Sequence, residues 1–245
     1  MSCSESKTVP GSLAKFAPSH MTVLSALYHS TLGKKYIMAL SGLGLFGFVV
    51  VHMLGNLQVF LGPEPLNAYA VFIKSKPVLL WTTRLGLLAL VFLHILTAVQ
   101  LTLRNRAARP EKYDRNKPYR ANYASRTLFL SGAALFAFIV YHLMHFTVGL
   151  VDPAYLQLRD SADRHDVYRM TILGFSHPGV SAFYIASMAL LCLHLSHGVG
   201  STFQSIGFKN KQTAGWIDRV SKMLAVIVFL GNSSMPLAVL AGIIR

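Results

Sequence analysis

Charged residues are scarce in this chain, and their scarcity indicates its class. Asp, Glu, Lys and Arg make up only 13% of the 245 residues, whereas hydrophobic residues make up 53%. A soluble domain usually carries about a quarter charged residues. The charges present lie mostly in loops, which leaves five continuous apolar stretches of at least the roughly 20 residues needed to cross a bilayer. The composition therefore excludes an ordinary soluble domain and indicates an integral membrane protein.

Cysteine is also rare, and its absence from key motifs excludes some chemistry. Only Cys3 and Cys192 are present, and we expect no disulfide between them. No Cys-x-x-Cys-His motif occurs, which excludes covalent attachment of a c-type haem. The first thirty residues have no apolar core followed by a cleavage site, so we expect no cleaved signal peptide. The apolar stretches lack the strict alternation of a membrane β-barrel.

The apolar stretches predict the fold. We expect a single domain, residues 1–245, folded as an all-α bundle with transmembrane helices over 36–61, 78–103, 127–151, 178–203 and 216–244. The segment 62–77 is expected to be a loop. The longer polar loop, 152–177, is expected to hold a short surface helix around residues 161–170.

The basic residues predict the orientation. The formal net charge is +14, and the Lys and Arg residues gather before the first helix and in the loops 104–126 and 204–222. Cytoplasmic loops of membrane proteins are enriched in Lys and Arg, so the N-terminus is expected in the cytoplasm and the C-terminus outside. The same rule explains the excess of basic residues, so nucleic-acid binding is not needed to explain it. The chain also has no nucleic-acid-binding motif.

Histidines recur deep inside the first four stretches, and none lies in the fifth. They are His52, His94, His142 with His145, and His194 with His197. An ionisable group inside a bilayer is costly, and such groups usually face the bundle interior and serve a function.

The depths of these histidines predict two pairs. At about 1.5 Å per residue, His52 lies roughly 24 Å from the cytoplasmic end of its helix, and His142 is similarly deep. On the returning helices, His94 and His194 lie roughly 13 Å from that end. We call His52 with His142 the outer pair, and His94 with His194 the inner pair. Two levels about 10 Å apart favour two b-type haems, each with its iron held by two imidazoles.

Alternatives remain at the level of single residues. A lone histidine can hydrogen-bond a neighbouring helix or belong to a proton path. A zinc or copper site usually needs three or four ligands at one level, often including carboxylate or cysteine. His145 and His197 lie one turn from the chosen ligands, so they are alternative ligands, or groups that contact a haem propionate or line a quinone pocket.

Several motifs resemble a known family. They are His52-x-x-x-Asn56, Tyr141-His142, the stretch 176–207 with His194-x-x-x-Gly198, and His29-Ser30-Thr31-Leu32-Gly33-Lys34-Lys35. Together they resemble the single-chain, five-helix, diheme cytochrome b anchor of succinate dehydrogenase and fumarate reductase. In this family a Gly follows the haem ligand by four residues. Gly198 follows His194 at this spacing, so the resemblance favours His194 over His197 as the ligand. Cys192 stands where some diheme fumarate reductases carry a glutamate, which favours succinate dehydrogenase.

The resemblance implies a function in the bacterial cytoplasmic membrane. The chain would anchor a flavoprotein subunit with FAD and an iron–sulfur subunit on its cytoplasmic face, and would carry electrons to or from a membrane quinone, expected to be menaquinone. His29 and Ser30 are candidates for the quinone vicinity. The chain alone is expected to have no succinate activity. The alternatives are an anchor for fumarate reductase, hydrogenase or formate dehydrogenase, a haem-free proton or ion transporter, and an anchor that has lost haem.

Overall fold

The structure, a computed structural model, describes residue 25, residues 28–108 and residues 123–245, with no side chains described at 123–127. In these ranges the regular elements are helices, and β-pairing is limited to one isolated bridge between Arg159 and His165. Cys3 and most of the basic loop 104–126 lie outside the described residues.

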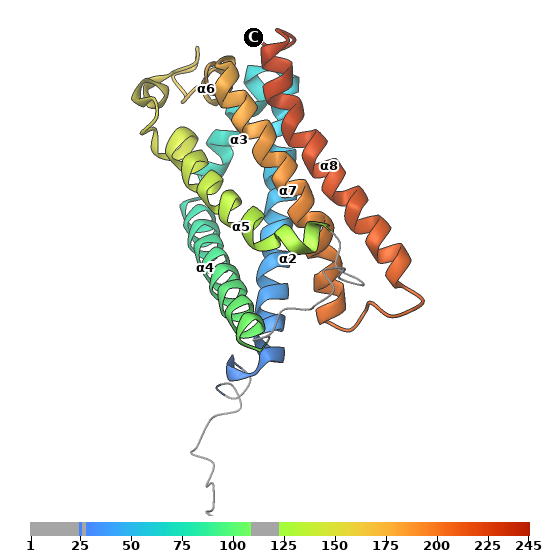
Figure 1. Ribbon diagram of the computed structural model, residues 1–245. Coiled ribbons are helices and arrows are strands. Elements are labelled where there is room, and N and C mark those ends of the chain that lie inside the picture. The colour runs from blue at the N-terminus through green and yellow to red at the C-terminus, as the bar shows by residue number, and fades with distance from the viewer. Residues whose placement is uncertain (1–24, 26–27, 109–122) are drawn as a thin grey trace, which may run out of the picture.

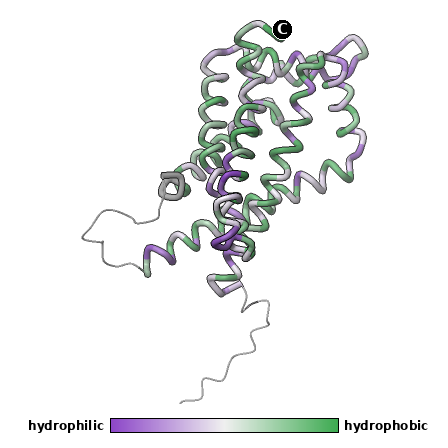
Figure 2. Tube along the Cα trace, turned by 90° about the vertical axis from the view of Figure 1, so that its right-hand side faces the viewer, coloured by the Kyte–Doolittle hydropathy of each residue, from purple (hydrophilic) through white to green (hydrophobic). Residues whose placement is uncertain are grey.

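Five long apolar helices form a bundle, which confirms the predicted all-α membrane fold (Figure 1). They are α2 (Thr31–Asn56), extended by the 3-10 helix η1 (Leu57–Leu61); α4 (Pro77–Ala107); α5 (Tyr123–His142), extended by the π-helix η2 (Leu143–Val148); α7 (Pro178–Ser205); and α8 (Ala214–Leu240). Hydrophobic residues cover most of their length (Figure 2). Large side chains such as Leu88 and Leu130 are exposed on the bundle surface, as contact with lipid requires.

Local chemistry explains where the helices start and stop. The Ser30 hydroxyl accepts a hydrogen bond from the Gly33 amide at 2.8 Å and caps α2, which therefore begins five residues before the predicted start. Pro77 and Pro178 occupy the first turns of α4 and α7. Gly149 has φ of 71°, a left-handed conformation that ends η2 before the predicted residue 151.

Two shorter helices correct the sequence-based expectation. Residues 62–77 are not a plain loop, because α3 (Pro63–Lys74) occupies most of them, with proline in its first turn. The surface helix of the 152–177 segment is α6 (Val167–Ser176), later in the chain than 161–170. Asp166 sets this start, because its side chain accepts a hydrogen bond from the Arg169 amide at 2.9 Å. A 3-10 turn, η3 (Pro153–Gln157), precedes it.

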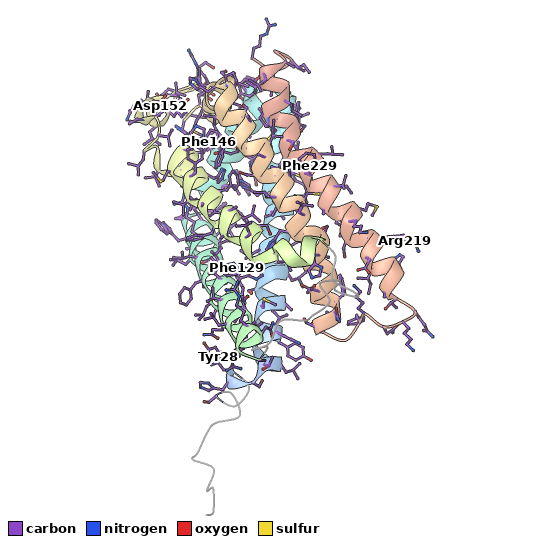
Figure 3. All side chains as sticks on the ribbon, viewed as in Figure 1. Tyr28, Phe129, Phe146, Asp152, Arg219 and Phe229 are labelled. Carbon is purple, nitrogen blue, oxygen red and sulfur yellow. The ribbon has the colours of Figure 1, made fainter. Side chains whose placement is uncertain are left out.

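These short elements cover one end of the bundle (Figure 1). Asn67 of α3 is fully buried, donates to Asp166 at 3.0 Å and to Asp160 at 3.3 Å, and accepts from the Tyr168 amide at 3.0 Å. Arg164 forms ion pairs with Glu64 at 2.5 Å and with Asp160 at 2.8 Å. We call this the C-terminal end, where Asp152 also lies, and the opposite end, with Tyr28 and Arg219, the N-terminal end (Figure 3).

Some helices of the bundle pack closely on one another and others face each other across the bundle, which we call lying on a diagonal. α2 packs against α4 and α7, α5 packs against α7, and α8 covers α7. In contrast, α2 and α5 are not closely packed on one another, and neither are α4 and α7 or α4 and α5. The first two of these three pairs of helices carry the predicted histidine pairs.

Candidate functional site

The structure brings the two residues of the outer pair together. The imidazole rings of His52 on α2 and His142 at the end of α5 have centroids 5.8 Å apart, with an angle of 86° between their planes. Phe48 stacks on His52 at 5.2 Å, and Phe138 lies 5.9 Å from His142. The two rings therefore meet across the diagonal between α2 and α5 among aromatic side chains.

The inner pair also meets across a diagonal. His94 on α4 and His194 on α7 have ring centroids 6.4 Å apart and an interplanar angle of 64°. Both side chains are half-buried. His197, one turn along α7, has no imidazole partner in the described part of the chain.

Neighbouring serines show how far apart the two levels lie. Ser41 on α2 lies 3.3 Å from His94, and Ser131 on α5 lies 3.3 Å from His194. Each serine precedes the outer-pair histidine of its own helix by eleven residues, which is about three turns, or roughly 16 Å, so the two levels lie farther apart than the predicted separation of about 10 Å. After three turns a helix presents the same face again, so one face of α2, and one face of α5, contacts the histidines at both levels.

The neighbours of the inner histidines favour one tautomer, in which Nδ1 carries the proton. The Ser41 hydroxyl donates to the Ile37 carbonyl at 2.7 Å, which leaves its oxygen to accept from Nδ1 of His94. The Met38 carbonyl is a second acceptor for the same nitrogen at 3.2 Å.

The Ser131 hydroxyl is placed in the same way, because it donates to the Leu128 carbonyl at 3.1 Å and accepts from Nδ1 of His194. With Nδ1 protonated, Nε2 of each ring keeps a lone pair for a metal.

The Tyr184 hydroxyl connects His142 with His145. It lies 3.3 Å from Nδ1 of His142 and 3.1 Å from Nδ1 of His145. A hydroxyl has one proton, so it can accept from one ring while donating to the other. If His142 uses Nε2 as a ligand, its Nδ1 donates to Tyr184, and Tyr184 donates to His145.

His145 takes a supporting position in the structure. Its side chain is 2% exposed, and its ring packs 4.0 Å from Phe146 and 6.0 Å from Tyr155. It belongs to the π-helical turn η2, a feature often found at functional sites. Of the two neighbouring histidines on this helix, His142 is therefore the one that faces His52.

Glycines give the imidazoles room. A Cβ atom at Gly42 would lie 3.1 Å from Cε1 of His94, and one at Gly132 would lie 3.6 Å from Cε1 of His194. At Gly47 and Gly198 an added Cβ would meet nothing within 4 Å. Gly42 and Gly132 thus lie directly against the two inner imidazoles, whereas Gly47 lies on an exposed face of α2.

This arrangement fits b-type haem by its donor set and its spacing. Two imidazole nitrogens bound at about 2.0–2.1 Å on opposite sides of one metal ion place their ring centroids roughly 6.3 Å apart. The observed 5.8 and 6.4 Å lie close to this separation. In the described ranges, no three His, Cys, Asp or Glu side chains gather into a group that could hold a bare metal ion. Paired imidazoles suit an iron whose other ligands come from a porphyrin.

The residues proposed for the quinone vicinity lie at the N-terminal end. His29 is exposed and its carbonyl accepts from Arg104 at 3.1 Å, while Ser30 caps α2. Next to them Lys34 is 4% exposed and donates to Gln100, whose amide donates to the Tyr28 hydroxyl at 3.3 Å. The polar group is thus built around Lys34 and Gln100.

Sequence reasoning missed the groups that orient the histidines. No role in orienting a histidine was predicted for Ser41, Ser131, Met38 or Tyr184. All four contact a histidine of a different helix, so no local spacing reveals them. Comparisons with protein families, with curated proteins and with solved structures find no match to this chain.

Proposed function

We propose that the chain is a diheme cytochrome b membrane anchor of a succinate:quinone oxidoreductase. The observation that carries the proposal is the meeting of four imidazoles two by two, at 5.8 and 6.4 Å, at two levels of one membrane bundle. A transport site would not require this pairing. An iron–porphyrin with two axial histidines does.

The residues of the chain have distinct tasks in this function. His52 and His142 would hold the outer haem, and His94 and His194 the inner one. Haem bound in this way supplies a one-electron redox centre with both axial positions filled, suited to electron transfer rather than oxygen binding. Ser41, Ser131 and Tyr184 fix the Nδ1 proton of the rings and make the imidazoles more basic. Phe48 packs beside His52 and Phe138 beside His142, and the His52 side chain is exposed.

The charge distribution supports docking at the N-terminal end. The described basic residues there are Lys34, Lys35, Arg104, Arg106, Lys209, Lys211, Arg219 and Lys222. Asp218 is ion-paired with Lys209 at 2.6 Å, so it offers little opposing charge. The positive-inside rule places this end in the cytoplasm and the C-terminus outside. A flavoprotein carrying FAD and an iron–sulfur protein would bind this face, in a bacterial cytoplasmic membrane.

The electron path would end at a membrane quinone, which we take to be menaquinone. His29 and Ser30 remain the residues proposed for its vicinity. The Ser30 hydroxyl is engaged as a helix cap. The neighbouring polar group of Lys34 and Gln100 therefore offers a quinone more hydrogen-bond donors than Ser30 does.

A second candidate function is a haem-free proton transporter. The hydrogen-bonded row of His142, Tyr184 and His145 favours it, because such rows can pass protons. It gives no reason for the inner pair, whose Nδ1 atoms bond only to serine hydroxyls and a backbone carbonyl.

Purification with native partners tests the proposal. A tag on the chain should recover a flavoprotein and an iron–sulfur protein from detergent-solubilised membranes, and succinate should reduce the b-type haem in that complex. Recovery of hydrogenase or formate dehydrogenase subunits, with haem reduced by hydrogen or formate instead, would assign the anchor to another enzyme. A complex without haem absorbance would contradict the proposal.

A further inference from the structure

A basic cavity opens at the C-terminal end of the bundle. Its volume is about 330 Å³, and its lining includes the cations Lys74 of α3, Arg84 of α4 and Arg159 of the loop before α6, together with His165 and Thr147. Of the described residues that line it, none is acidic. Three cations from three separate elements therefore converge on one space.

None of the three cations forms an ion pair with a described residue. Arg159 donates to the carbonyls of Leu156 and Leu158 at 3.1 and 3.0 Å. The Arg84 guanidinium lies 5.3 Å from the centroid of the Trp81 ring.

Within the described part of the chain, the one acceptor of Lys74 is neutral. Its ammonium lies 3.4 Å from Nδ1 of His165, and the other ring nitrogen of His165 donates to the Tyr155 carbonyl at 3.1 Å. Burial lowers the pKa of Lys74, and the charges of Arg159 and Arg84 lower it further. The protein thus brings like charges together and compensates them only with neutral groups.

Two acidic groups of the neighbouring loop, Asp160 and Asp166, are already engaged. Asp160 accepts from Arg164 at 2.8 Å, and Asp166 accepts from Asn67 at 3.0 Å and from the Arg169 amide at 2.9 Å. The three cations are exposed side chains, and like charges brought this close repel one another unless an anion joins them. An oxyanion of a ligand would supply the missing charge, with guanidinium groups suited to bind it in bidentate fashion.

The cavity adjoins the outer histidine pair. The Phe146 ring forms part of its lining and lies 6.0 Å from the His142 ring. One aromatic ring therefore separates the basic cavity from the imidazole that faces His52.

The place of the cavity beside Phe146 favours one source of the anion. A carboxylate of a porphyrin held by His142 would lie on the other side of this one aromatic ring from the cavity. A lipid phosphate would instead reach the exposed side chain of Arg84 from the headgroup layer.

We propose that this cavity is an oxyanion site that binds a carboxylate of the outer haem, with Arg84 and Lys74 as its principal contacts. The proposal rests on the proposed haem function. The same chemistry would accept a phosphate from an anionic lipid, and the experiment separates the two sources.

The test compares Arg84→Gln and Lys74→Gln with the wild type and with Lys76→Gln. Lys76 is an exposed lysine near Lys74 that does not line the cavity. Each protein is purified in maltoside micelles stripped of phospholipid and, separately, in phosphatidylglycerol nanodiscs. The haem content and the midpoint potentials of both haems are measured, and the outer haem is identified as the one lost from His142→Ala.

Removal of a cation beside a haem carboxylate disfavours the added electron. We expect both cavity variants to keep their haems and to lower the potential of the outer haem alone, equally in micelles and nanodiscs. A tenfold change in its reduction equilibrium is about 59 mV. Lys76→Gln should change neither potential.

Three results would overturn the assignment. Unchanged potentials with full haem content would reject the cavity as an anion site while leaving the haem proposal intact. Shifts seen only in phosphatidylglycerol would assign the anion to lipid phosphate. A wild-type chain that purifies without haem would reject the proposed function, and the carboxylate assignment with it.

Discussion

The Tyr184 hydroxyl lies 3.3 Å from Nδ1 of His142, which couples α7 to the outer histidine pair. This contact places a hydrogen-bond acceptor behind the imidazole that faces His52, as is usual for metal-binding histidines. The same hydroxyl also contacts His145 at 3.1 Å, so a single side chain orders two histidines.

Tyr184→Phe should weaken the outer haem without removing it. Loss of a hydrogen bond behind a metal ligand typically costs about 10–100-fold in affinity. Haem titration into the purified apoprotein should show this loss at one of two sites. Tyr141→Phe is the control, since Tyr141 lies in the same aromatic cluster but bonds no histidine. Equal weakening by both variants would mean that the aromatic packing, rather than the hydroxyl, matters.

Gly42→Ala should disturb the inner site alone. The new methyl group would lie 3.1 Å from Cε1 of His94 and press on a ring held by the Met38 carbonyl. We expect lower occupancy of the inner haem and an altered low-spin EPR signal. Gly86→Ala on α4, where an added Cβ meets nothing within 4 Å, should leave both haems unchanged. A normal inner haem in Gly42→Ala would contradict this packing.

His145→Ala and His197→Ala should each retain two low-spin haems. His145 bonds to Tyr184 and packs in the core, and His197 faces no second imidazole in the described ranges. Absorbance and EPR spectra of the purified variants measure this directly. Conversion of either haem to a high-spin form would show that the neighbouring histidine is the true ligand.

Acid should open the cap formed by α3, α6 and the loop between η3 and α6. The hydrogen bond from Arg164 is the main cause that lowers the pKa of Glu64. Burial raises the pKa of Asp160, but the hydrogen bonds from Arg164 and Ala162 outweigh it, so that pKa is lowered overall. Depressed carboxyl pKa values stabilise the fold above their unfolded values, about 3.9 for Asp and 4.3 for Glu, and this stability is lost as pH falls through the folded pKa.

Pepsin cleavage of the 158–166 segment measures this opening. Relative to an unfolded substrate at the same pH, which corrects for the pH dependence of pepsin itself, cleavage should be slow at a pH of about 5 and should rise below about 4, as pH approaches the lowered pKa values of these carboxylates. Arg164→Gln, which removes the partner of both carboxylates, should be cleaved at both pH values. Cleavage of the wild type that does not depend on pH would contradict the role of these ion pairs.

The sequence was sufficient to predict the bundle and the pairing of the histidines. The constant rise of an α-helix turns residue number into depth, so His52 with His142 and His94 with His194 could be matched before any coordinates were known. The lengths of the apolar stretches set the number of crossings in the same way.

Features that depend on contacts between helices could not be predicted. The 62–77 segment carries too few apolar residues to stand out, and α3 is secured by the buried contacts of Asn67 to the loop and to α6. The choice between His142 and His145 depends on the π-helical turn and on Tyr184, which comes from another helix. Lys74, Arg84 and Arg159 line the basic cavity from three separate segments. The sequence of any one segment does not predict that the three side chains converge.

A haem count on single-pair variants tests the central claim most directly. Pyridine haemochrome assays on purified protein should give two b-type haems per chain for the wild type, one for each histidine pair. His52→Ala or His142→Ala should remove the outer haem only, and His94→Ala or His194→Ala the inner haem only, with circular dichroism confirming that each variant is folded. A wild-type chain without haem, or folded variants that lose both haems whichever histidine is replaced, would contradict the account.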